Sequence, residues 1–160
     1  MRIRICFIVL IIGLSSSFKA QVDDPNNKLV LAPVNNLFDA MREGDSLKLR
    51  SSFHNDVRMY TSFISNEGQV ILEEGSLIEF LLAVGTPHEN VWDEKIWNVS
   101  VRIDDNIAHV WCDYGFYVDD KFSHCGVDAF QLVKTNGKEW QIINLIDTRK
   151  RVDCYLPEGK

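Results

Sequence analysis

The spacing of apolar residues predicts helices in the first part of the chain. Over residues 29–41, apolar side chains recur every three or four positions, which is the period of one helix face. Gly44 is expected to end this helix, because glycine readily adopts the left-handed conformation found at helix ends. Asp45 or Ser46 then caps a second, short helix that runs to Phe53.

The period of the pattern changes after this second helix. Residues 57–65 and 69–73 flank Asn-Glu-Gly at 66–68, which predicts two strands joined in a hairpin. A third helix is expected over residues 77–84, with Ser76 as its cap.

Four long runs with strand character follow, separated by short polar turns. They cover residues 94–103, 107–118, 122–135 and 140–149. Helices that are segregated from a series of antiparallel strands predict an α+β fold. We expect a curved antiparallel sheet over three helices, in the order α-α-β-β-α-β-β-β-β, that encloses a cone with a pocket at its open end.

The first 20 residues have the layout of a secretory signal peptide. Arg2 and Arg4 precede an apolar run at residues 5–14, and small residues lead to Ala20. This run is too short for a membrane span, which needs ~20 apolar residues. We therefore expect export to the periplasm or the medium. The predicted organisation is a signal peptide at 1–20, a linker at 21–28, one folded domain at 29–151 and a C-terminal tail at 152–160.

Charge and cysteine spacing exclude several classes of function. The chain has 17 basic and 23 acidic residues, a net charge of −6, which argues against general nucleic-acid binding. Signal cleavage would leave Cys112, Cys125 and Cys154, so at least one thiol is unpaired or paired between chains. No C-x-x-C spacing occurs, and we predict no metal site and no cofactor. Cys112 and Cys125 are expected to be buried as small apolar side chains.

Three stretches of the chain resemble the nuclear transport factor 2-like superfamily. Residues 53–59 (FHNDVRM) are similar to the segment that leads into its first strand. Val110-Trp111 with Tyr114 and Phe116 resembles the fourth strand, and residues 140–143 (WQII) resemble the closing strand. The resemblance covers about residues 28–150 and is strongest to exported bacterial members, some grouped as lumazine-binding proteins. It implies a cone-shaped fold, but the superfamily contains enzymes, ligand binders and interaction domains.

Strand pairing predicts which side chains share a face. If Asp119 and Asp120 form a two-residue turn, then Tyr114 lies opposite Cys125. One face would then carry Trp111, Asp113, Tyr117, His124, Asp128 and Phe130, and the other Cys112, Tyr114, Phe116, Ser123, Cys125, Val127 and Ala129. A shift of one residue would exchange the faces of one strand relative to the other. The pattern leaves open which face is concave.

His124 is the leading candidate for acid–base chemistry, because histidine titrates near neutral pH. Asp128 lies four residues along the same strand, roughly 13 Å away, and is out of reach. A carboxylate from a neighbouring strand, Asp113 or Asp147, would have to partner the histidine. The alternative is a structural histidine that holds the sheet or a subunit interface.

The candidate ligand-binding residues are Trp111, Tyr114, Tyr117, His124, Asp128 and Arg149. The aromatic rings could stack on a flat ligand, or they could form the core and a dimer interface. Arg149 could bind an anion at the mouth of the cone, or it could pair with Asp147.

The sequence favours an exported domain that binds a small apolar or aromatic molecule and forms a homodimer. No nucleic-acid partner is expected, and no membrane partner after signal cleavage. Two alternatives stay open: a lyase or isomerase of the SnoaL or scytalone dehydratase type that uses a His–Asp pair in the cone, and a protein-interaction module. Residues 60–64 hold no carboxylate where the resemblance to ketosteroid isomerase implies a general base, which argues against chemistry of that type.

Overall fold

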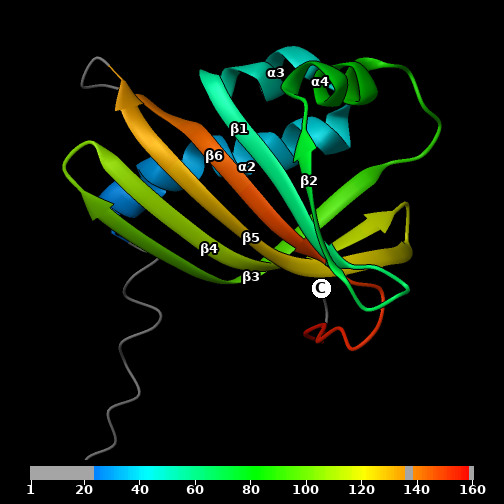
Figure 1. Ribbon diagram of the computed structural model, residues 1–160. Coiled ribbons are helices and arrows are strands. Elements are labelled where there is room, and N and C mark those ends of the chain that lie inside the picture. The colour runs from blue at the N-terminus through cyan, green and yellow to red at the C-terminus, as the bar shows by residue number, and fades with distance from the viewer. Residues whose placement is uncertain (1–23, 136–138, 159–160) are drawn as a thin grey trace, which may run out of the picture.

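A computed structural model describes residues 24–135 and 139–158. The predicted signal peptide, residues 21–23 of the predicted linker and the turn at 136–138 lie outside the described residues. The helices are α2 (Pro25–Glu43), α3 (Ser46–Ser51) and α4 (Leu77–Gly85), and the strands are β1 (Phe53–Ile64), β2 (Val70–Gly75), β3 (Trp92–Asp104), β4 (Ile107–Val118), β5 (Lys121–Thr135) and β6 (Glu139–Arg149). The helices gather on the concave side of one strongly curved, open sheet (Figure 1).

The strand order in the sheet is β2-β1-β6-β5-β4-β3. The predicted α+β class and order of elements are confirmed. One pairing differs from the antiparallel sheet that the sequence suggested, because β1 and β6 run parallel. After the β1–β2 hairpin, the chain crosses to the opposite edge through α4, and the next four strands return step by step to β1. This return sets β6 beside β1 and makes the sheet mixed.

The predicted caps at Gly44, Asp45 and Ser76 are confirmed, but two helix bounds differ from the prediction. Helix α3 ends at Ser51, and Phe53, which was expected to end it, begins β1. The other difference is at the start of α2. Gly44 is left-handed with φ 68°, and Asp45 Oδ1 accepts hydrogen bonds from two backbone N–H groups of α3. Helix α2 begins at Pro25, so residues 25–28 are helical and the expected linker is wrong there. The reason is local: proline suits the first helical turn, and the side chain of Asp24 caps the backbone N–H of Asn26.

A bulge in β5 changes which side chains share a face. Val118 pairs with Lys121 as predicted, but the register shifts by one residue at Ser123, which has no partner of its own. Tyr114 therefore lies opposite Gly126 instead of Cys125. The predicted faces are wrong for most of β5 relative to β4: His124, Asp128 and Phe130 lie with Cys112, Tyr114 and Phe116, and not with Trp111 and Asp113.

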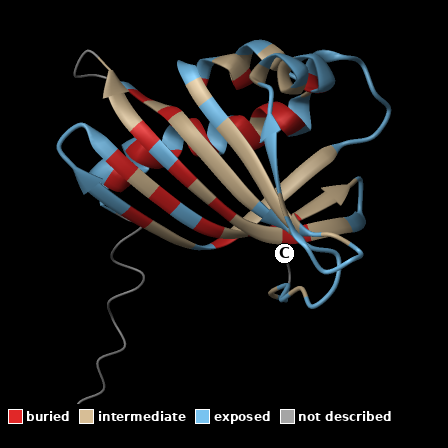
Figure 2. Cartoon of the chain, viewed as in Figure 1, coloured by how far each residue is buried: buried red, intermediate tan, exposed pale blue. Residues whose placement is uncertain are grey.

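The hydrophobic core fills the space between α2 and the concave face of the sheet. Val34 of α2 and Val110 and Ile142 of the sheet are fully buried, and the ring of Phe38 meets Phe130 edge to face. Buried bands recur along β4 and β5 in alternation with more exposed positions (Figure 2). Trp140 is buried, and Phe116 packs against the core.

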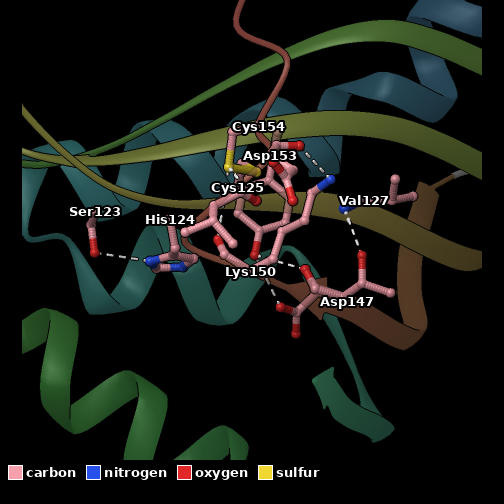
Figure 3. The surroundings of a disulfide bond; sticks show 11 residues. Ser123, His124, Cys125, Val127, Asp147, Lys150, Asp153 and Cys154 are labelled. Atoms are coloured by element: carbon pink, nitrogen blue, oxygen red, sulfur yellow. Dashed lines mark hydrogen bonds between the residues drawn. A yellow bond between two sulfur atoms is a disulfide. The ribbon is translucent and has the colours of Figure 1, made fainter. Parts of the chain in front are cut away.

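A disulfide holds the C-terminal tail on the outer face of the sheet. Cys125 of β5 is bonded to Cys154, and the backbones of Cys125 and Lys150 exchange two hydrogen bonds (Figure 3). Cys125 is buried as predicted, but it forms a disulfide and is not a small apolar thiol, because the bulge turns this side chain outward to meet the tail. Cys112 is the buried apolar thiol that the sequence predicted.

Replacement of Cys154 by serine is expected to lower the free energy of unfolding by about 3 kcal/mol, because the disulfide closes a loop across a sequence separation of 29 residues. For a domain of this size, the melting temperature should fall by about 10 °C. Thermal unfolding followed by circular dichroism measures the change. A reducing agent should destabilise the wild type and leave Cys154→Ser unaffected; equal melting temperatures for the two oxidised proteins would contradict the prediction.

Candidate functional site

The main pocket lies between the concave face of the sheet and the helices α2 and α4. Its volume is about 390 Å³. Apolar side chains form most of its wall, among them Leu37, Phe38, Met41, Met59, Phe80, Ala83, Phe130 and Leu145. Polar side chains form the rest: Tyr60, Thr61, Ser76, Glu79, Glu94, Tyr114, Asp128, Asp147 and Arg149. The pocket is therefore amphipathic.

The register of the sheet gathers the polar side chains. Asp128 of β5 is directly opposite Asp147 of β6, which is in turn opposite Thr61 of β1. Glu94 comes from the edge strand β3, where it alternates with Trp92 and shares its face. Side chains from distant parts of the chain thus meet at one place on the concave face.

Asp147 is an acid whose oxygens are all engaged. Oδ1 accepts a 2.6 Å hydrogen bond from Thr61 Oγ1, and Oδ2 accepts one of 3.2 Å from the hydroxyl of Tyr114. The guanidinium of Arg149 lies 3.5 Å from Oδ2. Two hydroxyl donors and one cation stabilise a negative charge here.

Tyr114 holds its hydroxyl at this point because Gly126 leaves space for its ring. A Cβ atom at Gly126 would lie 2.8 Å from the Tyr114 ring and 1.7 Å from the carbonyl oxygen of Thr148. The same hydroxyl is 3.0 Å from that carbonyl oxygen. Burial, followed by the charge of Asp147, raises the pKa of Tyr114, so the phenol keeps its proton and acts as a donor.

Glu94 and Asp128 form a second acidic group with a different character. The two carboxyls lie close enough to influence each other's pKa, and within the described part of the chain neither has a salt bridge. Burial, with smaller contributions from neighbouring charges, raises the pKa of Glu94 to about 7. Burial and then the charge of Glu94 raise the pKa of Asp128 well above its usual range. The pair therefore retains a proton near neutral pH.

One atom of this pair has no partner. Asp128 is only 4% exposed, and its Oδ2 accepts no hydrogen bond from any described residue. Buried acceptors are nearly always satisfied, so this atom marks a place where a ligand group can bind.

The structure brings four of the predicted site residues together: Tyr114, Asp128, Asp147 and Arg149 line the main pocket. Arg149 pairs with Asp147, one of the two uses considered for it.

The remaining candidates lie elsewhere. Trp111 is 48% exposed on the outer face of the sheet. Asp113 lies on the same outer face, where it accepts a 2.7 Å hydrogen bond from the side chain of Asn98. Tyr117 packs against the ring of Phe122. The expectation that these side chains face one site with His124 is wrong, and the bulge in β5 is the reason.

His124 is on the concave face, but the described residues include no carboxylate in an ion pair with it. Its Nδ1 lies 2.9 Å from Ser123 Oγ, and its ring contacts Phe116. Burial, with the positive charges of Arg149 and Arg151, lowers the pKa of His124 to about 4. The expected His–Asp pair is therefore not assembled, and Asp147 is occupied by other partners.

Two residues of the site were missed from the sequence. Glu94 alternates with Trp92 and Ile96, both of which pack against the core, and this period of two is a signal that Glu94 faces inward. Thr61 gave no such signal, because only the parallel pairing of β1 with β6 sets it beside Asp147.

The described residues contain no group of three or more side chains suited to hold a metal ion. Within the same ranges, no helix is both long and apolar enough to cross a membrane.

Solved structures with the same fold share little sequence with this chain. A "Putative Scytalone Dehydratase" from Novosphingobium aromaticivorans is 13% identical over 84% of this chain and 94% of its own, with a TM-score of 0.61. A "putative ketosteroid isomerase" from Shewanella frigidimarina is 19% identical over 79% and 96%, with a TM-score of 0.54. An NTF2-like protein from Cytophaga hutchinsonii is 12% identical over 77% and 97%, with a TM-score of 0.60. At these identities the likeness shows the fold alone.

The fold is shared with solved structures described as NTF2-like, which is the fold that the resemblance implied. The model of the family described as "Putative lumazine-binding" matches residues 25–146, and the chain belongs to this family. No curated protein matches the chain.

The buried acid pair makes a testable contribution to the pH dependence of stability. The pKa of Glu94 is raised in the folded state from its ordinary 4.5 to about 7, so its stabilising protonation is complete below pH 4.5 and is lost as the pH rises through 7. The free energy of unfolding of the wild type should therefore fall between pH 5 and 7, by up to about 1.4 kcal/mol per pH unit and per proton. This fall is measured relative to the double variant that carries Glu94→Gln and Asp128→Asn.

Urea unfolding at several pH values measures this difference. The opposite contribution of His124 is common to both proteins and cancels. Glu74→Gln, which removes an exposed acid of β2, is a matched control that should follow the wild type. If the difference in free energy of unfolding between the wild type and the double variant does not change with pH, Glu94 and Asp128 do not hold a proton near neutral pH.

Proposed function

We propose that this chain is an exported binding domain that takes a small, partly apolar molecule into the pocket of its cone. The observation that carries the proposal is the amphipathic pocket of about 390 Å³, in which side chains from α2 and α4 form an apolar wall beside a cluster of polar groups that includes the buried Asp128. Its size falls in the usual range for small-molecule sites, about 300–1,000 Å³, and a few convergent polar groups are typical of such sites. Membership of the "Putative lumazine-binding" family supports the same reading.

Binding is favoured over the lyase or isomerase that the sequence left open. That alternative depended on His124 with a carboxylate partner, and the described residues do not form this pair. His124 is also not among the residues that line the main pocket. Its lowered pKa, about 4, is far from the value that suits acid–base work at neutral pH.

Two independent features support export. The first 20 residues have the layout of a signal peptide. The disulfide between Cys125 and Cys154 is typical of proteins that fold in an oxidising compartment such as the periplasm.

Ligand binding is expected to depend on the opening beside α4. Ala83 lines the pocket from an exposed position, so Ala83→Trp should fill the opening without disturbing the core. Ile78 is on the same helix, is 71% exposed and does not line the pocket, so Ile78→Trp is the matched control.

Native mass spectrometry and thermal shift with a library of small aromatic and aliphatic compounds measure the effect. Compounds that bind the wild type and Ile78→Trp should bind Ala83→Trp at least about tenfold more weakly, a loss of about 1.4 kcal/mol. Binding that is equal in all three proteins would place the ligand elsewhere and contradict the proposal.

We also propose that the outer face of the sheet forms a homodimer. Helices cover only the concave face, and Trp111 is 48% exposed on the other, beside the ring of His109. Half-exposed indoles on a sheet face are typical of interfaces.

Sedimentation equilibrium should show a dimer that Trp111→Glu converts to a monomer. Leu82→Glu, on the exposed face of α4, should remain dimeric; a monomeric wild type would refute the proposal.

A further inference from the structure

The polar groups of the pocket contain more hydrogen-bond acceptors than donors. Four carboxyl groups, from Glu79, Glu94, Asp128 and Asp147, line it together with one guanidinium, from Arg149. That guanidinium already pairs with Asp147. The Glu94–Asp128 pair has no cation of its own in the described part of the chain.

The hydroxyl donors nearest to the acids are also engaged. Thr61 donates to Asp147, and the hydroxyl of Tyr114 is shared between Asp147 and the carbonyl oxygen of Thr148. Asp128 Oδ2 therefore stays unpartnered in a side chain that is 4% exposed and lines the pocket. Leaving a buried acceptor unpaired costs free energy, which a ligand that brings a donor would recover.

We propose that the ligand is an apolar amine whose ammonium group binds between Asp128 and Glu94 while its apolar body packs against α2 and α4. This inference rests on the proposed function and specifies the chemical class of the ligand. An ammonium carries only donors and one positive charge, which match an unpartnered acceptor and an unpaired acidic group. An anionic ligand would instead approach four carboxyls, and a neutral alcohol would supply one donor without the charge.

The pH dependence of binding follows from the groups around the pair. Titratable and charged groups from several elements surround the Glu94–Asp128 pair. The sheet contributes Asp93 on β3, Cys112 and Tyr114 on β4, and Asp147 and Arg149 on β6. The pocket wall adds Glu79 from α4 and Tyr60 from β1. With no ligand bound, the pair holds a proton up to about pH 7. A bound ammonium replaces this proton, which passes to the solvent. Affinity should therefore rise with pH up to about 7 and then level off.

Three indoles of similar shape and different charge test the proposal. Tryptamine carries an ammonium that stays charged across the range, tryptophol carries a hydroxyl in its place, and indole-3-propionate carries a carboxylate. Isothermal titration calorimetry at pH 6, 7 and 8 compares their affinities. Tryptamine should bind at least about tenfold more tightly than tryptophol at pH 8, a preference of about 1.4 kcal/mol. The affinity for tryptamine should fall up to about tenfold from pH 7 to 6. Tryptamine binding should also release up to one proton, which titrations in buffers of different ionisation enthalpy measure.

Variants separate charge recognition from packing. Asp128→Asn and Glu94→Gln keep the shape of each side chain and remove its charge, so both should lose the preference for tryptamine over tryptophol. Asp104→Asn is the matched control, because it removes an exposed acid at the far end of the strand that carries Glu94, and it should retain the preference.

The outcomes distinguish this inference from the function on which it rests. Tryptophol or indole-3-propionate binding as tightly as tryptamine at pH 8 would overturn the amine assignment and leave a small-molecule pocket in place. A preference for tryptamine that survives in both Asp128→Asn and Glu94→Gln would also overturn it. Failure of all three indoles to bind would contradict both the amine assignment and the proposed function.

Discussion

The burial of two neighbouring carboxyl groups without a cation of their own is the constraint on which the site depends. Asp128 is buried and Glu94 is partly buried inside the cone, so both lose hydration, and a buried charge without a partner is costly. A retained proton lowers this cost, because it reduces the negative charge of the pair. Asp147 lies on the neighbouring strand, and its negative charge is stabilised in another way, by two hydroxyl donors and the guanidinium of Arg149. Adjacent acids thus have distinct chemical roles because their surroundings differ.

The fold supplies the geometry that this constraint requires. The return of β6 to β1 brings Asp147 next to Thr61, and the bulge at Ser123 turns Asp128 inward. Gly126 lets β5 approach β6 closely enough for Tyr114 to reach across. On the outer face, the disulfide from Cys125 ties down the chain directly after β6, where Asp147 and Arg149 end the strand (Figure 3). The tail therefore supports the strand end that carries part of the pocket.

Much of the fold could be predicted from the sequence, because helix caps, periodicity and turn residues are local signals. The caps at Gly44 and Asp45 are of this kind. The site was less accessible, since it depends on pairing between distant strands. One unpaired residue, Ser123, was enough to move His124 and Asp128 to the face of Tyr114, and nothing in the local pattern indicated it. The parallel pairing of β1 with β6 is likewise a property of the whole topology.

Nuclear magnetic resonance of the side-chain carboxyl carbons tests the central claim most directly. The protein labelled with ¹³C at aspartate and glutamate is titrated from pH 3 to 9, and Glu94→Gln and Asp128→Asn identify the two signals. The pair is expected to retain a proton up to about pH 7, with the Glu94 signal changing near that pH. Two signals that both complete their titration near pH 4, like exposed carboxyls, would contradict the account.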